Sequence, residues 1–343
     1  MSAWQPMWDK VLDANPIADA IALDLDYRRD RYRALDSGIL VEKPWADIVN
    51  NYSAPAGRTY FDSSGVLQTA GANEMIRAFD PATGGLLGNQ IFGTATNLFI
   101  NSNSPATQSI SVTAQTYTLS IYGTGSVTLS GASVGVLNGV ATNQRQTLTF
   151  TTTAGSLTLT VSGAVVYPQL QTGTAATPYV QTGGSPVTIA AENQIIDGSV
   201  FSDIWGAEGN TILCVGRSRT SGAYYWETSN GTTTDRRLFL RLSGEFVRAY
   251  NIYGGTTVAT ATFADPDNYA RMAYSAKNVT GDLHFAEGGV SSTFPAAPAP
   301  AAPDRLRIGS TVLAAGTPIN GYIERLVVLN RALPPSILQR LTA

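Results

Sequence analysis

The segment TLTFTTTAGSLTLTVSG, residues 147–163, alternates apolar and small polar side chains on both sides of a short turn. Its larger apolar residues are Leu148, Phe150, Leu157, Leu159 and Val161. Alternation with a period of two is typical of a strand that buries one of its faces. Because Ala154-Gly155 lies between the two alternating runs, we predict two strands joined as a hairpin, with the threonines facing away from the core.

The same pattern extends through the surrounding sequence. Arg145 is the only charged residue from position 82 to position 191, and Thr, Ser, Gly and Val dominate this stretch. Residues 117–122 and 127–130 form a second hairpin-like pair around Gly123-Thr124-Gly125. Strands of this kind, with turns roughly every 8–12 residues, are typical of a sandwich or jelly roll. We therefore predict a jelly-roll β-sandwich over residues 99–185, preceded by a short β connector over residues 50–98 that contains a hairpin turn at 62–65.

The composition excludes several classes of protein. A chain of 343 residues suggests about two or three domains, and its apolar share of 43% excludes disorder for most of its length. Charged residues make up only 14%, and the net charge is −3 without a long basic stretch. Binding to nucleic acid through counterion release therefore has little to act on, and we expect no nucleic-acid partner.

The apolar segments are too short for a membrane helix, which needs roughly 18–20 residues, so we expect no membrane insertion. The first 16 residues, MSAWQPMWDKVLDANP, contain Asp and Pro where a signal peptide has an uninterrupted apolar region. Cys214, the single cysteine, lies in the apolar run TILCVG, which indicates a buried thiol and rules out an internal disulfide framework. We expect the protein to be made in a cytoplasm.

Residues 1–49 differ in composition from the rest of the chain. They contain three of the five tryptophans and six basic residues against nine acidic ones. So short a segment buries its own tryptophans poorly, and we predict that it anchors the protein to a partner. The predicted anchoring residues are Trp4, Trp8, Arg28, Arg29, Arg31 and Arg33. Two interpretations of these arginines stay open: a docking segment for a neighbouring subunit, or a solvated strip interleaved with aspartates. Residues 23–27 are expected to form a strand.

The C-terminal part is predicted to be a second β domain over residues 186–343. Strand-like runs recur from residue 211 to residue 329, after the boundary Gly183-Gly184-Ser185-Pro186. The run FPAAPAPAAP, residues 294–303, is expected to be an extended surface loop, because proline lacks the donor that a central strand needs. Residues 336–341 are expected to form a short terminal helix.

The end of this domain, GYIERLVVLNRALPPSILQRL, resembles the closing segment of laminin G-like, concanavalin A-like domains. In those domains a Gly-x-Ile strand leads to a strand that ends in Asn-Arg-Ala-Leu, and a small helix follows. The matching residues are Gly321, Ile323, Leu326, Val328, Asn330, Arg331, Ala332, Leu333, Ile337 and Leu338. The resemblance implies a concanavalin A-like β-sandwich, and the expected fold class of the whole chain is all-β.

A longer stretch resembles virion proteins of tailed bacteriophages and gene transfer agents, in particular head-spike and fibre components. Its first part carries the match at Phe61, Gly65, Asn73, Arg77, Phe79, Asp80, Gly84, Leu87, Gly88, Thr96, Asn97 and Leu98. Its second part carries it at Gln169, Leu170, Gly173, Ala176, Thr177, Pro178, Tyr179 and Thr182. In that family a jelly-roll module follows the first part, as it does in the present prediction.

The resemblance implies a spike or fibre subunit on the surface of a phage-like particle. Such a protein attaches through its N-terminus to other virion subunits, of the capsid or of the tail, and binds bacterial surface polysaccharide. Virion appendages occupy symmetric positions, so we expect a homo-oligomer, trimer or pentamer. Two alternatives stay open: a capsule polysaccharide depolymerase, and a purely architectural decoration protein.

The sequence offers little for catalysis, and we expect a protein that is not an enzyme. His284 is the only histidine, and the sequence contains neither a Gly-x-Ser-x-Gly elbow nor a zinc-binding cluster of His and Cys. A glycosidase needs two neighbouring carboxylates, but the acids of the C-terminal domain are better explained as solvated turn residues. These acids are Asp203, Glu208, Glu227, Asp235, Glu245, Asp265, Asp267, Asp282 and Glu287.

We expect no metal and no cofactor. The run Asp265-Pro266-Asp267-Asn268 could offer oxygens to calcium, but it also has the sequence of a type I turn, which is the interpretation we favour.

The predicted carbohydrate-binding residues of the C-terminal domain are Trp226, Tyr250, Asn251, Tyr253, Asp265 and Asp267. Aromatic faces stack on sugar rings, and short polar side chains bind hydroxyls. Core packing is the competing interpretation for each aromatic. At least one of Tyr224 and Tyr225 is expected to face the core, because neighbouring residues of a strand point to opposite sides.

Overall fold

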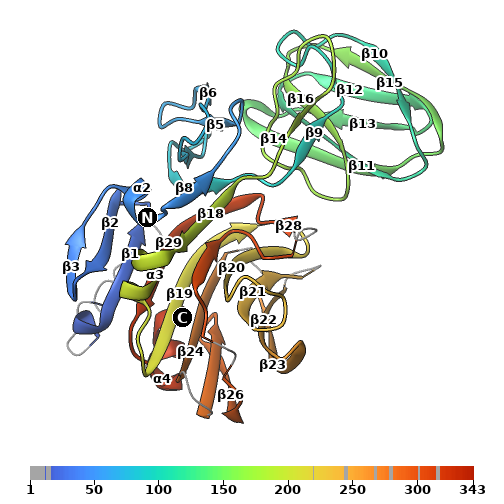
Figure 1. Ribbon diagram of the computed structural model, residues 1–343. Helices are drawn as coiled ribbons and strands as arrows, with labels where there is room; N and C mark the ends of the chain where they lie inside the picture. The colour runs from blue at the N-terminus through green and yellow to red at the C-terminus, as the bar shows by residue number, and fades with distance from the viewer. Residues whose placement is uncertain are drawn as a thin grey trace. The chain divides into compact units, whose positions relative to one another are not determined.

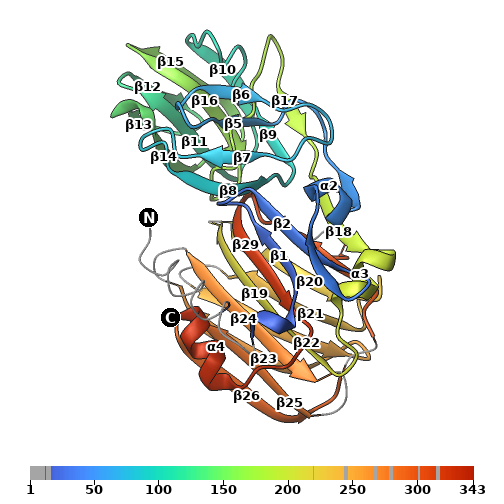
Figure 2. The same ribbon diagram turned by 90° about the vertical axis from the view of Figure 1, so that its left-hand side faces the viewer.

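The computed structural model describes residues 12, 17–218, 220–242, 246–265, 269–277, 281–299, 302–313 and 317–343. The predictions for Trp4, Trp8 and Asp267 lie outside the described residues. The chain packs as two compact units, one of residues 1–53 with 193–343 and the other of residues 54–192. Figures 1 and 2 show both units built from antiparallel sheets, which confirms the predicted all-β fold class with two β-sandwiches.

This division differs from the predicted one at the N-terminus. The strand β1 (Ile21–Asp26) lies between β29 (Gly321–Leu329) and β2 (Arg31–Asp36), and β3 (Ile39–Glu42) follows β2. All six residues of β1 are buried. Residues 17–53 are therefore part of the C-terminal sandwich rather than a separate segment, because the edge of β29 pairs with β1. The strand expected near residues 23–27 is confirmed.

The first sheet of this unit has the strand order β26-β25-β24-β19-β29-β1-β2-β3. Its remaining strands are β19 (Gly209–Ser218), β24 (Ala270–Lys277), β25 (Gly281–Glu287) and β26 (Val290–Ala297). The prediction of a surface loop over residues 294–303 is wrong for its first part, because residues 294–297 belong to β26. Pro295 is tolerated there because β26 is the edge strand and one side of it needs no donor.

The second sheet has the order β23-β22-β21-β20-β27-β18-β4, with β28 (Thr317–Pro318) parallel to β20. Its strands are β4 (Asn51–Ser53), β18 (Asn193–Asp197), β20 (Ala223–Ser229), β21 (Arg236–Arg241), β22 (Phe246–Tyr253), β23 (Thr256–Ala264) and β27 (Arg305–Ile308). The helical elements of the unit are η1 (Ala18–Ala20), α2 (Trp45–Ile48), α3 (Gly198–Ile204) and α4 (Pro335–Thr342). The predicted terminal helix is confirmed by α4.

Aromatic rings from both sheets meet in the core of this unit. Trp226 lies 5.7 Å from Phe239 of its own sheet and 5.8 Å from Tyr274 of the other, measured between ring centroids. Phe285 contacts both Phe239 and Tyr274. On the other face of the first sheet, α4 packs on β24, β25 and β26. Among the described residues, no helix is long and apolar enough to cross a membrane.

The unit of residues 54–192 contains a sandwich of two sheets, with strand orders β10-β15-β12-β13 and β14-β11-β16. The strands are β10 (Gln108–Val112), β11 (Thr116–Gly123), β12 (Ser126–Gly131), β13 (Gly135–Asn138), β14 (Ala141–Thr151), β15 (Gly155–Ser162) and β16 (Val165–Thr172). Leucine side chains from both sheets, including Leu119, Leu129 and Leu159, form its core.

Both hairpins predicted in this sandwich are wrong in their pairing, although their strands are confirmed. The strand β14 pairs with β11, whereas β15 pairs with β10 and β12. The turn at Ala154-Gly155 therefore passes from one sheet to the other, and the turn after Gly123 does the same between β11 and β12. Alternation identifies the buried face of each strand, and two strands on opposite sides of one core show it as clearly as two paired strands do.

The other strands of this unit are short. They are β5 (Thr59–Phe61), β6 (Leu67–Thr69), β7 (Arg77–Phe79), β8 (Leu86–Ile91), β9 (Ala95–Asn97) and β17 (Val187–Ile189). The predicted hairpin at 62–65 is confirmed, because β5 pairs with β6. A buried ion pair between Arg58 and Glu192 ties the start of the unit to its end.

Candidate functional site

Trp226, the aromatic residue predicted to stack on a sugar, lies in the core with no exposed surface. A shift of register between β20 and β21 at Tyr224 and Trp226 places Tyr225 and Trp226 both inside, although they are neighbours in sequence. The expectation that one of Tyr224 and Tyr225 faces the core is confirmed. The prediction for Trp226 is corrected, because its ring faces are taken up by Phe239 and Tyr274.

Asn251 and Asp265 are also buried, with exposed fractions of 2% and 1%. The Asn251 Nδ2 donates to the carbonyl oxygen of Pro298 at 3.2 Å. Asp265 forms an ion pair with Arg241 and accepts a hydrogen bond from the Tyr269 backbone N–H at 2.8 Å. The structure therefore assigns both predicted site residues to internal packing, which removes Asp265 as a sugar or calcium ligand.

Tyr250 is half-buried and Tyr253 is exposed. The Arg248 Nη1 donates to the Tyr250 hydroxyl at 3.1 Å, and its guanidinium lies 5.9 Å from that ring. Tyr253 is 48% exposed at the end of β22. Of the predicted constellation, these two are the accessible members among the described residues.

The arginines predicted to anchor the chain are paired within their own sheet. Asp24 accepts from Arg33 at 2.7 Å and from Arg31 at 3.4 Å, and Arg29 lies 3.5 Å from Asp26. Arg28 forms an ion pair with Glu324 at 2.5 Å. The contacts of Asp24 with Arg31 and Arg33 come from the alternation of β1 and β2, which puts these side chains on one face, whereas Arg28 and Arg29 lie in the turn between the two strands. The docking role of these arginines stays a prediction.

Two of the acids considered for catalysis, Glu227 and Glu287, are buried in β20 and β25, which corrects their interpretation as solvated turn residues. His284 lies in β25 as expected, and its Nδ1 is 3.0 Å from the Thr293 hydroxyl. Burial lowers the pKa of His284, although Asp282 opposes the shift. Cys214 is fully buried, as predicted, and burial raises the pKa of its thiol, which keeps it unreactive.

Asp197 and Asp304 line one hollow of about 550 Å³ beside α3, in the unit of residues 1–53 and 193–343. Arg305 holds both carboxylate oxygens of Asp304, at 2.6 and 3.0 Å, and this bonding lowers the pKa of Asp304. Asn51 donates to Asp197 at 2.8 Å. A glycosidase acid needs a raised pKa, so Asp304 does not fit that role.

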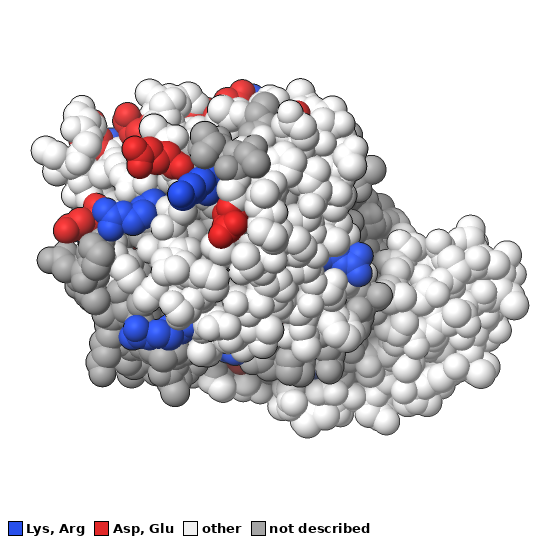
Figure 3. Space-filling view, turned by 90° about the horizontal axis from the view of Figure 1, so that it is seen from below, with Lys and Arg blue, Asp and Glu red and all other residues white. Residues whose placement is uncertain are grey.

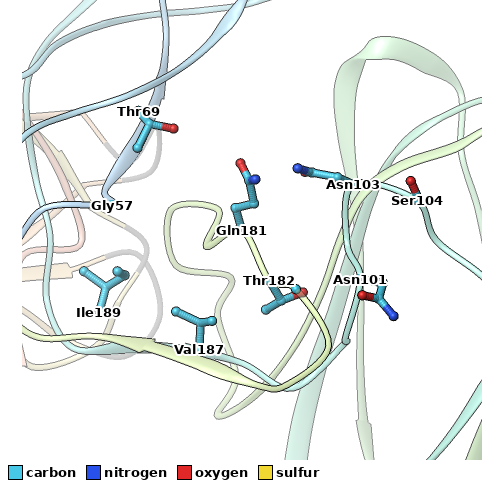
Figure 4. A pocket seen from close by; sticks show the side chains of 10 residues that line it. Gly57, Thr69, Asn101, Asn103, Ser104, Gln181, Thr182, Val187 and Ile189 are labelled. Carbon is cyan, nitrogen blue, oxygen red and sulfur yellow. The ribbon is translucent and has the colours of Figure 1, made fainter.

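A different hollow, of about 480 Å³, lies in the unit of residues 54–192. Figure 4 shows side chains from three separate segments directed toward it, with the amides of Asn103 and Gln181 facing each other across open space. It is lined by Gly57, Thr69, Asn101, Asn103, Ser104, Gln181, Thr182, Gly183, Val187 and Ile189. None of these residues is ionisable.

Two loops form one wall of this hollow, and buried hydroxyls hold them together. The Thr182 Oγ1 accepts from the Ser102 backbone N–H at 3.1 Å, and the Ser102 Oγ accepts from the Thr182 backbone N–H at 2.9 Å. The Tyr179 hydroxyl lies 2.6 Å from the Ser102 Oγ. Burial raises the pKa of Tyr179 to about 12, so this network is uncharged.

Asn101 adapts the first loop to this arrangement. It has a φ of 52°, in the left-handed region that asparagine tolerates better than most residues. Its backbone N–H donates to the Gly183 carbonyl oxygen at 2.7 Å, which joins the two loops again. With their backbones fixed in this way, the loops leave the side chains of Asn101, Asn103 and Gln181 exposed.

The chemistry of this hollow is that of hydrogen bonding without charge. Amide side chains offer donors and acceptors together, and hydroxyls offer both on one atom. In Figure 3 the lobe at the far right, which corresponds to the sandwich of this unit, shows no charged side chain. Among the described residues, no group of three or more His, Cys, Asp and Glu could hold a metal ion. The site can bind an uncharged polar ligand, but it lacks groups that transfer protons.

The sequence prediction missed this site because it followed aromatic residues in the C-terminal domain. The available signal was the run Asn101-Ser102-Asn103-Ser104 together with Gln181-Thr182, two amide- and hydroxyl-rich loops without charge. Their proximity could not be read from sequence, since about 80 residues separate them.

No protein-family model and no curated protein matches the sequence. Among solved structures, the IT-sialidase CBM40 of Ruminococcus gnavus bound to α2,3-sialyllactose gives a TM-score of 0.37 at 16% identity, over 44% of this chain and 93% of that one. The binding domain of botulinum neurotoxin serotype C1 gives 0.34 at 10% identity, over 44% and 40%. A mutant of the NanB sialidase from Streptococcus pneumoniae gives 0.34 at 8% identity, over 41% and 25%. Likeness at this level carries no functional conclusion.

Proposed function

We propose that this chain is a non-catalytic glycan-binding protein and that the hollow between Asn103 and Gln181 binds an uncharged sugar. The observation that carries the proposal is the lining of the hollow, which consists of amides, hydroxyls, glycines and two aliphatic side chains. A sugar without carboxylate or phosphate presents hydroxyls that both donate and accept, and amide groups satisfy both functions. The aliphatic side chains of Val187 and Ile189 offer contact to the carbon face of a ring.

The hollow is open and has no aromatic platform, so a single site binds weakly. Weak binding suffices for a protein that is displayed in several copies, because linked sites raise the effective concentration of one another. This fits the setting that the sequence resemblance implies, in which a homo-oligomeric spike or fibre on a phage-like particle binds bacterial surface polysaccharide. The particle setting rests on the resemblance alone.

The competing enzymatic function, cleavage of capsule polysaccharide, is less well supported. It needs a general acid and a second carboxylate in one cleft. Asp197 and Asp304 share a hollow, but Arg305 stabilises the ionised form of Asp304. Release of reducing ends from a capsular polysaccharide by the full chain would favour the enzyme over the binding protein.

The test is binding of the full chain to a panel of purified bacterial surface polysaccharides, half of them neutral and half acidic. We expect neutral polysaccharides to bind, and we expect Asn103→Ala and Gln181→Ala each to weaken binding by roughly five- to tenfold, the loss of one or two hydrogen bonds. Asn143→Ala is the matched control, an exposed amide on β14 outside the hollow. Binding of acidic polysaccharides alone, or unchanged binding by both hollow variants, would refute this assignment.

A further inference from the structure

Arg237, in β21, is an exception among the buried arginines of the described chain. The others have a carboxylate partner: Arg58 with Glu192, Arg236 with Glu227, Arg241 with Asp265, and Arg325 with Asp24. Arg237 is 1% exposed, and the described residues place no carboxylate within ion-pair distance of it. Since guanidinium keeps its proton in proteins, Arg237 is a buried positive charge without a negative one beside it in the part of the chain that the structure describes.

The contacts that Arg237 does make are uncharged. Its guanidinium lies 5.6 Å from the ring of Trp205. The positive charge of Arg237 also opposes the rise that burial causes in the pKa of Tyr274. The phenol of Tyr274 therefore stays neutral and supplies no counter-charge. A buried unpaired ion is strongly unfavourable, whereas a paired one is tolerated.

Unpaired hydrogen-bond donors lie on the same side of the sheet as Arg237. Thr228 is its direct cross-strand neighbour on β20, and Trp226 precedes Thr228 by two residues on the same strand. The Arg237 Nε, the Thr228 Oγ1 and the Trp226 Nε1 are all buried without a hydrogen-bond partner among the described residues. A guanidinium, a hydroxyl and an indole N–H can each donate to an anion.

One unpaired hydrogen-bond acceptor, the side-chain oxygen of Asn251, lies beside these donors. Asn251 is the neighbour of Arg237 on the other side, in β22, and its buried Oδ1 also has no hydrogen-bond partner among the described residues. An anion does not satisfy an acceptor, so Asn251 fits a water molecule bound next to the anion. Asn251 and Tyr274 help to line a small cavity of about 10 Å³, which has room for one water molecule.

We propose that the core of this sandwich binds a small inorganic anion, a halide such as chloride, between Arg237, Thr228 and Trp226. The anion supplies the counter-charge that the described residues do not place beside Arg237, and it accepts from the three unpaired donors. The carboxylate of a polymer cannot take its place, because a side chain that is 1% exposed is out of reach of a bulky ligand. The site is separate from the proposed sugar site, which belongs to the other unit, and does not depend on it.

Thermal unfolding of the full chain in chloride and in gluconate, at one ionic strength, tests the proposal. Gluconate is too large to enter the core. Each tenfold step in chloride above its Kd is expected to raise the melting temperature of this unit by about 3–5 °C. In Arg237→Met, the melting temperatures in chloride and in gluconate are expected to be equal. Arg248→Met, which removes an arginine from the neighbouring strand β22, is expected to keep the difference between the two salts.

Crystals grown in bromide provide a measurement that does not need a folded variant. An anomalous peak within hydrogen-bond reach of the Arg237 Nε would support the site. The control Arg248→Met is expected to show the same peak. Equal melting temperatures in chloride and gluconate, together with crystals that show no bromide at Arg237, would overturn the proposal. A chloride effect that persists in Arg237→Met would equally overturn it, since the anion would then bind elsewhere.

Discussion

Asp24 and Arg325 form a bidentate ion pair, although 301 residues separate them. The Arg325 Nε donates to one carboxylate oxygen at 2.8 Å and its Nη2 to the other at 3.1 Å. The two residues lie on β1 and β29, which are neighbours in the first sheet. The sandwich of residues 1–53 and 193–343 is thus completed by a strand from the opposite end of the chain.

Replacement of Asp24 by Asn is expected to lower the free energy of unfolding of this unit by about 3–5 kcal/mol, because the buried Arg325 loses its bidentate partner and keeps the more distant carboxylate of Asp26, at 3.8 Å. Urea denaturation at neutral pH measures the change. Asp36→Asn is the control, since Asp36 is an exposed residue of β2 paired with Lys43, and it should unfold like the natural protein. Equal stability of Asp24→Asn and the control would mean that the pair does not support the sheet.

The Asp24 carboxylate also makes the stability of this unit depend on pH. Burial raises the pKa of Asp24, but Arg325 and Arg33 outweigh it, and the net pKa lies below its usual value of 3.8. A lowered pKa in the folded state contributes stability above the unfolded-state pKa and loses it as pH falls through the folded-state pKa. The stability difference between the natural protein and Asp24→Asn should therefore be full at pH 6 and shrink below about pH 4. A difference that stays constant down to pH 2 would contradict this assignment.

Trp226→Ala is expected to destabilise its unit by about 3–5 kcal/mol, because it leaves a large cavity among Phe239 and Tyr274. If Trp226 were a sugar platform, the variant would instead keep its stability and lose polysaccharide binding. Chemical denaturation and polysaccharide binding at a temperature where the variant is folded distinguish the two roles. We expect lost stability with unchanged binding.

Thr182→Val removes the hydroxyl that joins the two loops of the proposed sugar site. It leaves the Ser102 N–H and the Phe99 carbonyl oxygen without their buried partner, which we expect to lower the free energy of unfolding by about 1–3 kcal/mol. Polysaccharide binding should weaken as well, because Asn103 and Gln181 are no longer held in place.

Thr182→Ser keeps the hydroxyl and is expected to restore most of the binding. Thr188→Val serves as the control, since Thr188 is exposed and its hydroxyl meets that of Thr96 at the surface. Loss of binding in the control, or no rescue by serine, would show that the hydroxyl at position 182 is not what positions the loops.

The sequence by itself determined many of the strands of this protein and the face that they bury, although it missed others such as β26. The alternation at 147–163 places Leu157 and Leu159 inward, and both are fully buried. The buried thiol of Cys214, the terminal helix after Pro334 and the all-β class follow from equally local signals. Such signals are reliable where a strand is regular, because its side chains then alternate between the two faces; the register shift in β20, which puts Tyr225 and Trp226 both inside, is an exception.

Only the tertiary structure decided which strands pair and which residues meet. The run around Ala154-Gly155 has the pattern of a hairpin, yet it crosses between sheets, because a core filled from two sheets gives both strands the same alternation. Asp24 pairs with Arg325, and Asn103 and Gln181 line one hollow, although the members of each pair are far apart in sequence. Local patterns record whether a side chain is buried, but they do not record which residues it packs against. The candidate site depends on which residues come together.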